Sequence, residues 1–305
     1  MANIIEVKNL VKHYGKLTAV NDISFSVRKG EIFGLLGENG AGKTTTLEII
    51  EGLRKPSSGK VSIFGKDVKN NINEIKERIG VQLQSSAYYD FLSLKDILNL
   101  FGSFYSKRID PDKLLDMVDL KDKEKSYISQ LSGGQKQRFS IVASLVNDPE
   151  LVFLDEPTTG LDPLARRNLW KVITKIRKQG KTIILTTHYM EEAERLCDRV
   201  AIMDAGKILV MGEVHDLIQK VKNPYHATFL ADKLKQSVIE EIKQCCGQLI
   251  NPNGKKNYYE LYVKDKSVFN KIIDIIQKEK IEDFTIGRAS LEDLFLELTG
   301  KTIEE

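Results

Sequence analysis

Residues 32–45, Ile-Phe-Gly-Leu-Leu-Gly-Glu-Asn-Gly-Ala-Gly-Lys-Thr-Thr, decide the fold of this chain. The first five form a continuous apolar run, which is typical of a strand covered on both faces. The segment from Lys43 to Gly52 has the spacing of a helix. Between strand and helix, Gly37 and Gly42 match the spacing of a phosphate-binding loop. The stretch therefore predicts a strand, a phosphate-binding loop and a helix, the central unit of an alternating α/β fold.

Each part of this loop has an expected contact with a nucleotide. The glycines let backbone N–H groups turn inward onto phosphate, Lys43 reaches the outer phosphates, and the Thr44 hydroxyl binds Mg²⁺. A chance glycine-rich turn is the alternative, and such a match should arise about once per hundred chains of this length. We expect the nucleotide to contact Gly37, Glu38, Asn39, Gly40, Ala41, Gly42, Lys43, Thr44 and Thr45.

A second apolar strand, residues 151–154, ends in two carboxylates, Asp155 and Glu156. A carboxylate at the C-terminal end of a parallel strand faces the same crevice as the phosphate-binding loop. We expect Asp155 to support Mg²⁺ and Glu156 to polarise a water for in-line attack on the γ-phosphate. The alternative is a pair of solvated charges at a strand end.

The pattern around these motifs predicts a core of several parts. Residues 4–8 and 22–27 alternate like strands and predict a β region at the start. Apolar residues from 84 to 147 have mostly helical spacing, which indicates an inserted helical subdomain. The strand pattern resumes at 182–185, after a helix whose apolar residues are Leu169, Trp170, Ile173 and Ile176. Residues 200–203 and 207–211 flank a turn and predict a hairpin.

A second, smaller domain is expected after residues 220–224, where Pro224 would stop a helix. The predicted elements beyond it have the β-α-β-β-α-β order of a ferredoxin-like unit: strands near 226–231 and 281–287, helices near 233–245 and 267–279, and a hairpin turned at 251–254. Ser290 to Asp293 resembles a capping box before one more amphipathic helix. We expect a nucleotide-binding domain at 1–222 and an accessory α+β domain at 223–305.

Composition excludes several classes of protein. With 305 residues and 41% hydrophobic composition, the chain can bury one large core or two modest ones. Three cysteines, two of them adjacent, do not make a disulfide framework. The start lacks the pattern of a signal peptide, and charges interrupt every apolar stretch, so we expect membrane contact only through another chain. Net charge is +3, and residues 223–305 hold 14 acidic against 12 basic side chains, so no nucleic-acid arm is expected.

Residues 131–138, Leu-Ser-Gly-Gly-Gln-Lys-Gln-Arg, resemble the signature of ATP-binding cassette (ABC) ATPases, at the usual interval before the 151–162 segment. In that family the signature turn docks across a dimer onto ATP held by the other subunit. A serine N-cap, exposed glycine N–H groups and a helix start all suit an anion. The resemblance implies a P-loop ABC ATPase core and nucleotide contacts from Ser132, Gly133, Gly134 and Gln135.

The same resemblance assigns four further positions. Gln84 is similar to the glutamine that contacts Mg²⁺ and the attacking water, with Gln82 close enough to be an alternative. His188, at a strand end, is similar to the histidine that holds the γ-phosphate, and Asp162 to the aspartate that links the two sites. Tyr14 resembles the aromatic residue that stacks on adenine, with Val20 as an apolar wall beside it. A tyrosine packed at a strand edge is the competing interpretation of Tyr14.

The resemblance implies an ATP-hydrolysing transporter subunit that uses ATP and Mg²⁺. Two copies, or this chain and a related subunit, would dimerise head to tail beneath a separate membrane permease, at the cytoplasmic face of the cell membrane. The segment from Gln84 to Leu94, with Tyr88, Tyr89 and Phe91, is the expected docking surface for the permease. Packing in the core of the helical subdomain is the alternative for any one of these aromatic residues. The ending at 290–300 resembles that of ATPase subunits of ABC-2-type exporters for drugs, antibiotics or sodium. A soluble ABC ATPase that acts on ribosomes or DNA is the alternative.

Overall fold

A computed structural model describes residues 2–82, 88–230, 236–246, 249–250, 258–279, 281 and 283–300. The chain forms two compact units, Met1–Val214 and His215–Glu305. Each unit has its own sheet structure and its own hydrophobic core.

The centre of the first unit is a six-stranded sheet with the order β10-β9-β3-β8-β7-β6. Neighbouring strands from β9 to β6 are parallel, and β10 pairs antiparallel with β9, as the predicted hairpin requires. Every residue of β3, β7 and β8 is buried, which confirms the prediction of strands covered on both faces. The strands are β3 (Ile32–Leu36), β6 (Ile79–Gln82), β7 (Leu151–Asp155), β8 (Thr182–Thr187), β9 (Arg199–Asp204) and β10 (Lys207–Glu213).

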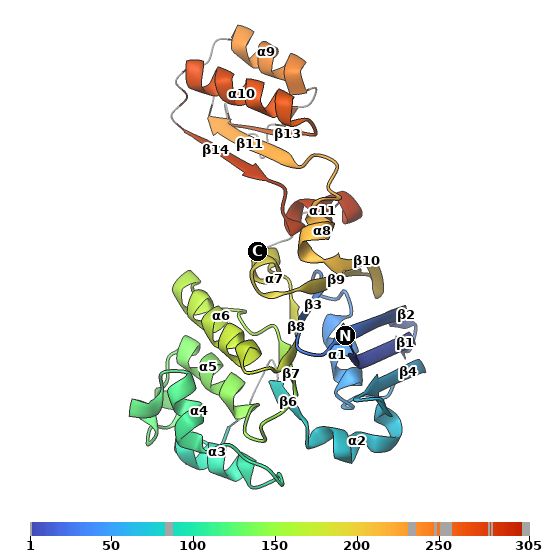
Figure 1. Cartoon of the computed structure of the whole chain (residues 1–305), viewed down its shortest axis with the longest axis vertical. Helices are drawn as coiled ribbons and strands as arrows, with labels where there is room; N and C mark the ends of the chain where they lie inside the picture. The colour runs from blue at the N-terminus through green and yellow to red at the C-terminus, as the bar shows by residue number, and fades with distance from the viewer. Residues whose placement is uncertain are drawn as a thin grey trace. The chain divides into compact units, whose positions relative to one another are not determined.

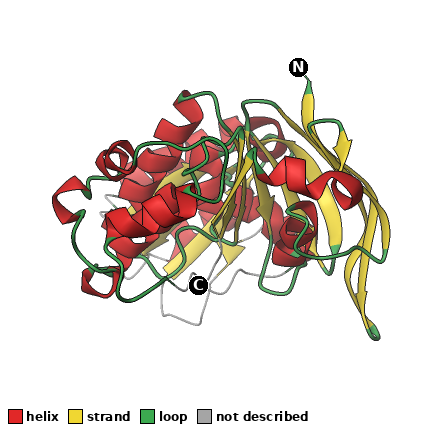
Figure 2. Cartoon of the chain, turned by 90° about the horizontal axis from the view of Figure 1, so that it is seen from below, coloured by secondary structure: helices red, strands yellow, loops and turns green. Residues whose placement is uncertain are grey.

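An antiparallel sheet with the order β2-β1-β4-β5 forms the second layer of this unit. Its strands are β1 (Asn3–Tyr14), β2 (Leu17–Arg28), β4 (Ser58–Ile63) and β5 (Lys66–Asp67). β1 and β2 extend beyond the predicted segments because they pair as one long hairpin, from Asn3 opposite Arg28 to Tyr14 opposite Leu17. Figures 1 and 2 both show these strands on the side opposite to most helices of the unit.

Helices cover the six-stranded sheet and form the inserted subdomain (Figure 1). The subdomain contains α3 (Leu94–Gly102), α4 (Pro111–Met117), the short 3₁₀ helices η1 (Lys121–Lys123) and η2 (Ile128–Gln130), and α5 (Gly133–Ala143). Its apolar residues at helical spacing, such as Leu94, Ile97 and Leu98, are buried as predicted. The other helices of this unit are α1 (Lys43–Ile50), α2 (Val68–Lys76), α6 (Pro163–Lys178) and α7 (Met190–Leu196).

The second unit has the β-α-β-β-α-β order that the sequence predicts. Its antiparallel sheet has the order β12-β13-β11-β14, so the first strand lies between the third and the fourth, as in a ferredoxin-like fold. The division between the units falls within α8 (Val214–Ile218). The remaining elements are β11 (Tyr225–Leu230), α9 (Gln236–Cys246), β12 (Leu249–Ile250), β13 (Tyr258–Val263), α10 (Lys266–Lys278), β14 (Phe284–Arg288) and α11 (Leu291–Thr299).

The last helix, α11, begins where the sequence predicts a capping box. The Ser290 hydroxyl accepts a hydrogen bond from Asp293 N, and the Asp293 carboxylate accepts one from Ser290 N. Leu291, Leu294 and Phe295 are buried, which confirms the predicted apolar face. Leu298 is 42% exposed, so this face covers only the first part of the helix.

Candidate active site

Strand register brings three sequence motifs to one edge of the six-stranded sheet. Leu36 of β3 lies opposite Thr187 of β8, and Asp155 of β7 lies opposite Thr186 of β8. The phosphate-binding loop follows β3, Glu156 follows β7, and His188 follows β8. Because these strands are parallel, their C-terminal ends open onto one crevice. The sheet therefore brings together the loop, the carboxylates and the histidine that the sequence predicts.

Two glycines of the loop are required by the close approach of neighbouring backbone. Gly37 has a φ of 151°, and a Cβ there would lie 2.3 Å from the Met203 carbonyl oxygen. Gly42 has a φ of 100°, and its Cβ would lie 2.3 Å from the Ala19 carbonyl oxygen. Only glycine combines these dihedral angles with this space. The loop is therefore shaped from both sides, by the end of β9 and by the start of β2.

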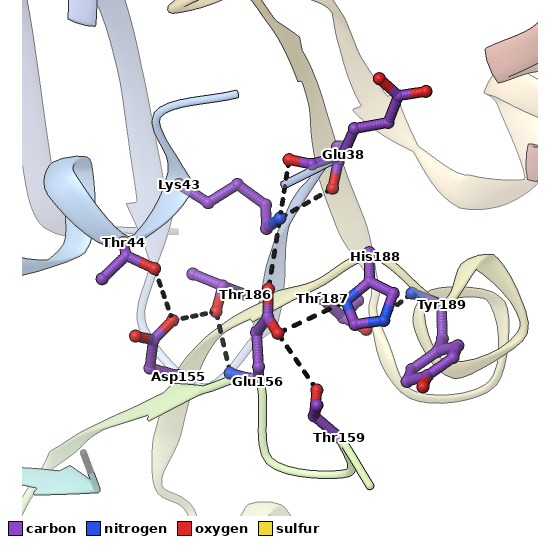
Figure 3. A network of polar contacts seen from close by, with 11 residues as sticks. Glu38, Lys43, Thr44, Asp155, Glu156, Thr159, Thr186, Thr187, His188 and Tyr189 are labelled. Atoms are coloured by element: carbon purple, nitrogen blue, oxygen red, sulfur yellow. Dashed lines mark hydrogen bonds and ion pairs between the residues drawn. The ribbon is translucent and has the colours of Figure 1, made fainter. Parts of the chain in front are cut away.

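Lys43 is buried in the crevice and held by the loop itself (Figure 3). Its Nζ donates hydrogen bonds to the carbonyl oxygens of Gly37 at 2.7 Å and Glu38 at 3.1 Å. The same ammonium lies 3.3 Å from Glu156 Oε1. Burial lowers the pKa of Lys43, and the nearby Glu156 carboxylate opposes this shift. The ammonium thus lies beside loop carbonyls and a carboxylate, at the place where the outer phosphates are expected.

Thr44 and Asp155 form a compact set of oxygen atoms that fits Mg²⁺. The Thr44 hydroxyl donates to Asp155 Oδ1 at 3.3 Å, and Thr186 donates to the same carboxylate oxygen. Burial raises the pKa of Asp155, while the two threonine hydrogen bonds oppose the shift. Among the described residues no three His, Cys, Asp or Glu side chains gather into a metal cluster. Magnesium in phosphate-binding loops needs few protein ligands, since the phosphates and waters supply most of them.

Glu156 lies between the two predicted contacts of the γ-phosphate, Lys43 and His188. His188 Nδ1 is 3.4 Å from Glu156 Oε2, and the Thr159 hydroxyl donates to that oxygen at 3.1 Å (Figure 3). Burial alone would raise the pKa of Glu156, but Lys43, His188 and the Thr159 hydrogen bond outweigh burial and lower it. The carboxylate is therefore ionised, as a base for a water molecule must be.

The backbone of Glu156 adopts the left-handed conformation, with a φ of 47°. Such a conformation is uncommon for a residue with a side chain and indicates functional constraint. Two hydrogen bonds support it, because Glu156 N donates to the Thr186 hydroxyl at 2.9 Å and to the Thr186 carbonyl at 3.2 Å. Thr186, which the sequence analysis did not single out, thus holds both carboxylates. The signal for it was a polar residue at the end of an otherwise apolar strand.

The signature turn caps α5 at the surface of the helical subdomain. Ser132 is the N-cap, with Gln135 N donating to its hydroxyl at 3.4 Å and Ser132 N donating to Gln135 Oε1 at 3.0 Å. Ser132 and Gly133 are exposed, and a Cβ added at Gly133 would meet nothing within 4 Å. The predicted cap is confirmed, and the contact of this turn with a nucleotide stays a prediction. Asp162, the other predicted link between sites, is the N-cap of α6.

Tyr14 and Val20 differ in their surroundings. Tyr14 is 38% exposed at the end of β1, with Lys12 Nζ 5.0 Å and Arg54 Cζ 5.6 Å from the ring centroid. Its ring has free surface for a base. Val20 is fully buried in the core, so its side chain has no surface for a ligand in this conformation. The adenine contact of Tyr14 stays a prediction. The side chain of Val20 does not form the exposed apolar surface beside Tyr14 that the resemblance implies.

Two expectations concern the segment after β6. Gln84 lies outside the described residues, so its predicted role stays a prediction. Tyr89 is 62% exposed and Phe91 is 91% exposed, as a docking surface requires. Tyr88 was expected beside them at the surface, but its ring packs on Phe101 at 6.1 Å and on Phe139 at 5.4 Å. Tyr88 therefore belongs to the apolar side of α3 and α5.

Behind these helices lies a cavity of about 510 Å³ that the sequence analysis did not predict. It is lined by the end of α1, by β6, and by α3 and α5; the lining includes Glu51, Leu53, Val81, Tyr88, Phe104 and Tyr105. Burial, together with the nearby Asp155 and Glu48, raises the pKa of Glu51 to about 8.

Among the described residues no helix has the length and apolar composition that a membrane crossing requires.

Comparison with known proteins agrees with this site. The family model described as ABC transporter matches residues 20–159. Nod factor export ATP-binding protein I of Burkholderia orbicola (strain AU 1054) is 34% identical and covers 99% of this chain and 98% of its own length. The protein of that name from Rhizobium leguminosarum bv. viciae is also 34% identical, over 99% of this chain and 96% of the relative.

Solved structures show the same fold. The ATP-binding subunit of an ABC transporter superposes with a TM-score of 0.64 at 32% identity, covering 71% of this chain and 92% of that chain. A dimeric ATP-binding cassette in a post-hydrolysis state, bound to ADP and phosphate, superposes with a TM-score of 0.62 at 25% identity, over 68% of this chain and 98% of that one. From these likenesses and the site, the chain belongs to the ATP-binding subunits of ABC transporters and is an ATPase.

Proposed function

We propose that this chain hydrolyses ATP with Mg²⁺ in the crevice described above, and that hydrolysis drives a membrane exporter. One observation carries the assignment: Glu156 contacts both Lys43 and His188 at the end of the central sheet. The arrangement puts a cation for phosphate, a carboxylate for water and a histidine for the γ-phosphate within one set of contacts. Curated relatives over nearly the whole chain are named as export ATP-binding proteins, which supports the direction of transport.

The contacts of Lys43 suggest how the site changes when nucleotide enters. Lys43 donates to the carbonyls of Gly37 and Glu38 and pairs with Glu156. Incoming phosphate oxygens compete for the same ammonium, which frees the Glu156 carboxylate for a water molecule. Mg²⁺, when bound, neutralises developing charge on the phosphates, and Thr44 with Asp155 would hold it. His188 then orients the γ-phosphate from the end of β8.

The site of one chain lacks the signature turn, and we propose that a second subunit supplies it. Ser132 and Gly133 are exposed at the start of α5, where N–H groups and the helix dipole favour an anion. The partner is a second copy or a related ATPase subunit. The solved dimer of a similar cassette bound to ADP and phosphate supports a dimeric assembly. Asp162, at the N-cap of α6, would link the two nucleotide sites.

The permease is the second proposed partner. The apolar cavity beside Phe104 and Tyr105, together with the exposed Tyr89 and Phe91, offers an aromatic surface for helices of a separate membrane protein. Through that contact the chain would reside at the cytoplasmic face of the cell membrane. We further propose that residues 1–222 are the motor and 223–305 an accessory domain, and that no nucleic acid is bound.

Purification from native membranes tests this function. A tagged chain should recover a protein with several membrane-spanning helices, and Phe91→Ser combined with Tyr89→Ser should reduce that recovery while leaving basal ATPase activity unchanged. A matched control is Leu209→Ser, because Leu209 is 39% exposed on β10, at the opposite edge of the sheet from β6. Recovery of ribosomes or DNA in place of a membrane protein would overturn the proposal in favour of a soluble ABC ATPase.

A further inference from the structure

A buried glutamate behind the active site has no role so far. Glu192 on α7 is fully buried, and its Oε1 accepts a hydrogen bond from Trp170 Nε1 on α6 at 3.0 Å. Burial raises the pKa of Glu192, while the side chains of Thr187, Thr158 and Trp170 oppose the shift. Burying a carboxyl group costs free energy unless its oxygens are hydrogen-bonded. The position of Glu192 therefore calls for an explanation.

Glu192 faces two segments that hold the reacting side chains. Thr158 belongs to the loop after Glu156, and its neighbour Thr159 donates to Glu156 Oε2 at 3.1 Å. Thr187 directly precedes His188, and its hydroxyl accepts a hydrogen bond from Tyr189 N at 3.0 Å. The loop that fixes the base and the strand end that carries the histidine therefore each place a threonine side chain next to this carboxyl group.

Tyr189 extends this arrangement to the ring of His188. The two ring centroids are 4.1 Å apart, and the guanidinium of Arg166 lies 4.1 Å from the centroid of the Tyr189 ring. The charge of Arg166 also acts on Glu192 and lowers its pKa. Arg166 lies in the first turn of α6, just after Asp162. Arg166 on α6 therefore contacts the ring beside His188 and also acts on Glu192 through its charge.

The cluster contains several buried polar atoms without a hydrogen bond. Among the described residues these include Thr158 Oγ1, Arg166 Nε and Glu192 Oε2. Buried polar atoms are usually hydrogen-bonded, so several unbonded ones in one place set this cluster apart from ordinary core packing.

We propose that Glu192 is a positioning residue for ATP hydrolysis, which ties the loop after Glu156 to the strand end that carries His188. The inference rests on the proposed roles of Glu156 and His188. Glu192 touches neither nucleotide nor water; it acts by keeping the two reacting side chains in one relative position. Loss of that position affects the chemical step and leaves ATP binding by the phosphate loop intact.

Steady-state kinetics of four variants test the proposal: Glu192→Gln, Thr158→Val, the double variant and Trp170→Phe. Glu192→Gln leaves one acceptor oxygen, which Trp170 uses already. We expect each of the first two changes to lower kcat about tenfold with an ATP KM within about twofold, because misplacement affects turnover more than binding. The double variant should be no slower than the slower single variant, since both changes act on the same pair of neighbouring side chains.

Trp170→Phe is the matched structural control. It removes the hydrogen bond of Trp170 Nε1 to Glu192 Oε1 and changes neither loop segment, so it should lower the melting temperature and leave kcat within about twofold. The inference is wrong if Glu192→Gln leaves kcat unchanged, if Trp170→Phe lowers kcat equally, or if the losses multiply to about a hundredfold in the double variant. If Glu156→Gln abolishes turnover while Glu192→Gln does not, the inference fails and the proposed function stands.

Discussion

The phosphate loop and the signature turn present their glycines in opposite surroundings. In the loop, Gly37 and Gly42 press against carbonyl oxygens of other strands, and Lys43 is only 3% exposed. In the turn, Gly133 faces open space and Ser132 is exposed. Both segments offer N–H groups at the start of a helix, so the chemistry is shared and the surroundings differ.

This difference indicates which half of the site one chain can complete. The loop is enclosed by its own subunit, and its Lys43 and Thr44 contact Glu156 and Asp155. The turn has only its own cap, and we propose that it contacts a nucleotide held by another subunit. An enclosed half and an open half on one chain are what a symmetric head-to-tail pair requires.

The largest expected effect is on the enclosed half. Glu156→Gln should lower kcat about 10²–10⁴-fold, because the amide cannot accept a proton from water. The variant should still bind ATP and accumulate as an ATP-bound dimer, which size-exclusion chromatography would measure. Glu150→Gln at the other end of β7, 40% exposed at its side chain, is the matched control and should leave turnover unchanged. Undiminished ATPase activity in Glu156→Gln would remove this residue as the base.

Mixing two inactive variants tests the open half. Lys43→Ala damages the loop, and Ser132→Arg blocks the turn, so each variant alone should lose most activity. In a mixed dimer one site combines the intact loop with the intact turn, so equal amounts should recover about a quarter of the wild-type ATPase rate. A mixture that stays inactive, with mixed dimers present, would show that each subunit completes its own site.

Burial behind the loop predicts a pH effect on stability. Glu51, at the end of α1, has its pKa raised from 4.5 to about 8 in the folded chain. Between these values the unfolded chain releases a proton that the folded chain keeps, so rising pH lowers the free energy of unfolding. Glu51→Gln should remove this loss and stabilise the chain by about 4 kcal/mol near pH 7.5, with no gain near pH 4.

Chemical denaturation at several pH values would measure this gain. Glu48→Gln on the same helix is the control, because Glu48 is 25% exposed at its side chain and pairs with Arg54. That change should shift stability by no more than about 1 kcal/mol at any pH. If the free energy of unfolding changes with pH in the same way in the wild type and in Glu51→Gln, the raised pKa of Glu51 is refuted.

The smallest expected effect concerns the base of the nucleotide. Tyr14→Ala should weaken ATP binding by about 1–2 kcal/mol through lost stacking. Binding of inorganic triphosphate should not change, and Tyr14→Phe should behave as wild type because it keeps the ring. Isothermal titration with both ligands measures the difference. An equal loss for ATP and triphosphate would assign Tyr14 to the strand edge.

The sequence predicted the residues of the phosphate loop and the carboxylates better than the residues that hold them in place. Lys43, Asp155 and Glu156 were found because their spacing and their place after apolar strands are local signals. Thr186, Glu192 and Glu51 were missed because their roles depend on contacts with residues far apart in the chain. Tyr88 was misjudged for the same reason, since only the packing of α3 against α5 shows which aromatic ring faces inward.

For the fold as well, local features were predicted and long-range contacts were not. Strand and helix order came from periodicity, which each segment carries by itself. The length of the β1–β2 hairpin depended on pairing along its whole extent, and periodicity within one strand did not reveal it. The ferredoxin-like order was predicted, whereas the neighbours in its sheet are set by long-range pairing.

The left-handed backbone of Glu156 implies a trade between activity and robustness. Holding a residue with a side chain at a φ of 47° costs about 1–2 kcal/mol, which glycine would avoid and asparagine would reduce. Neither alternative has a carboxylate. Substitutions that relieve this backbone strain would therefore stabilise the protein and remove the catalytic base. Selection for stability alone would drive the position away from glutamate.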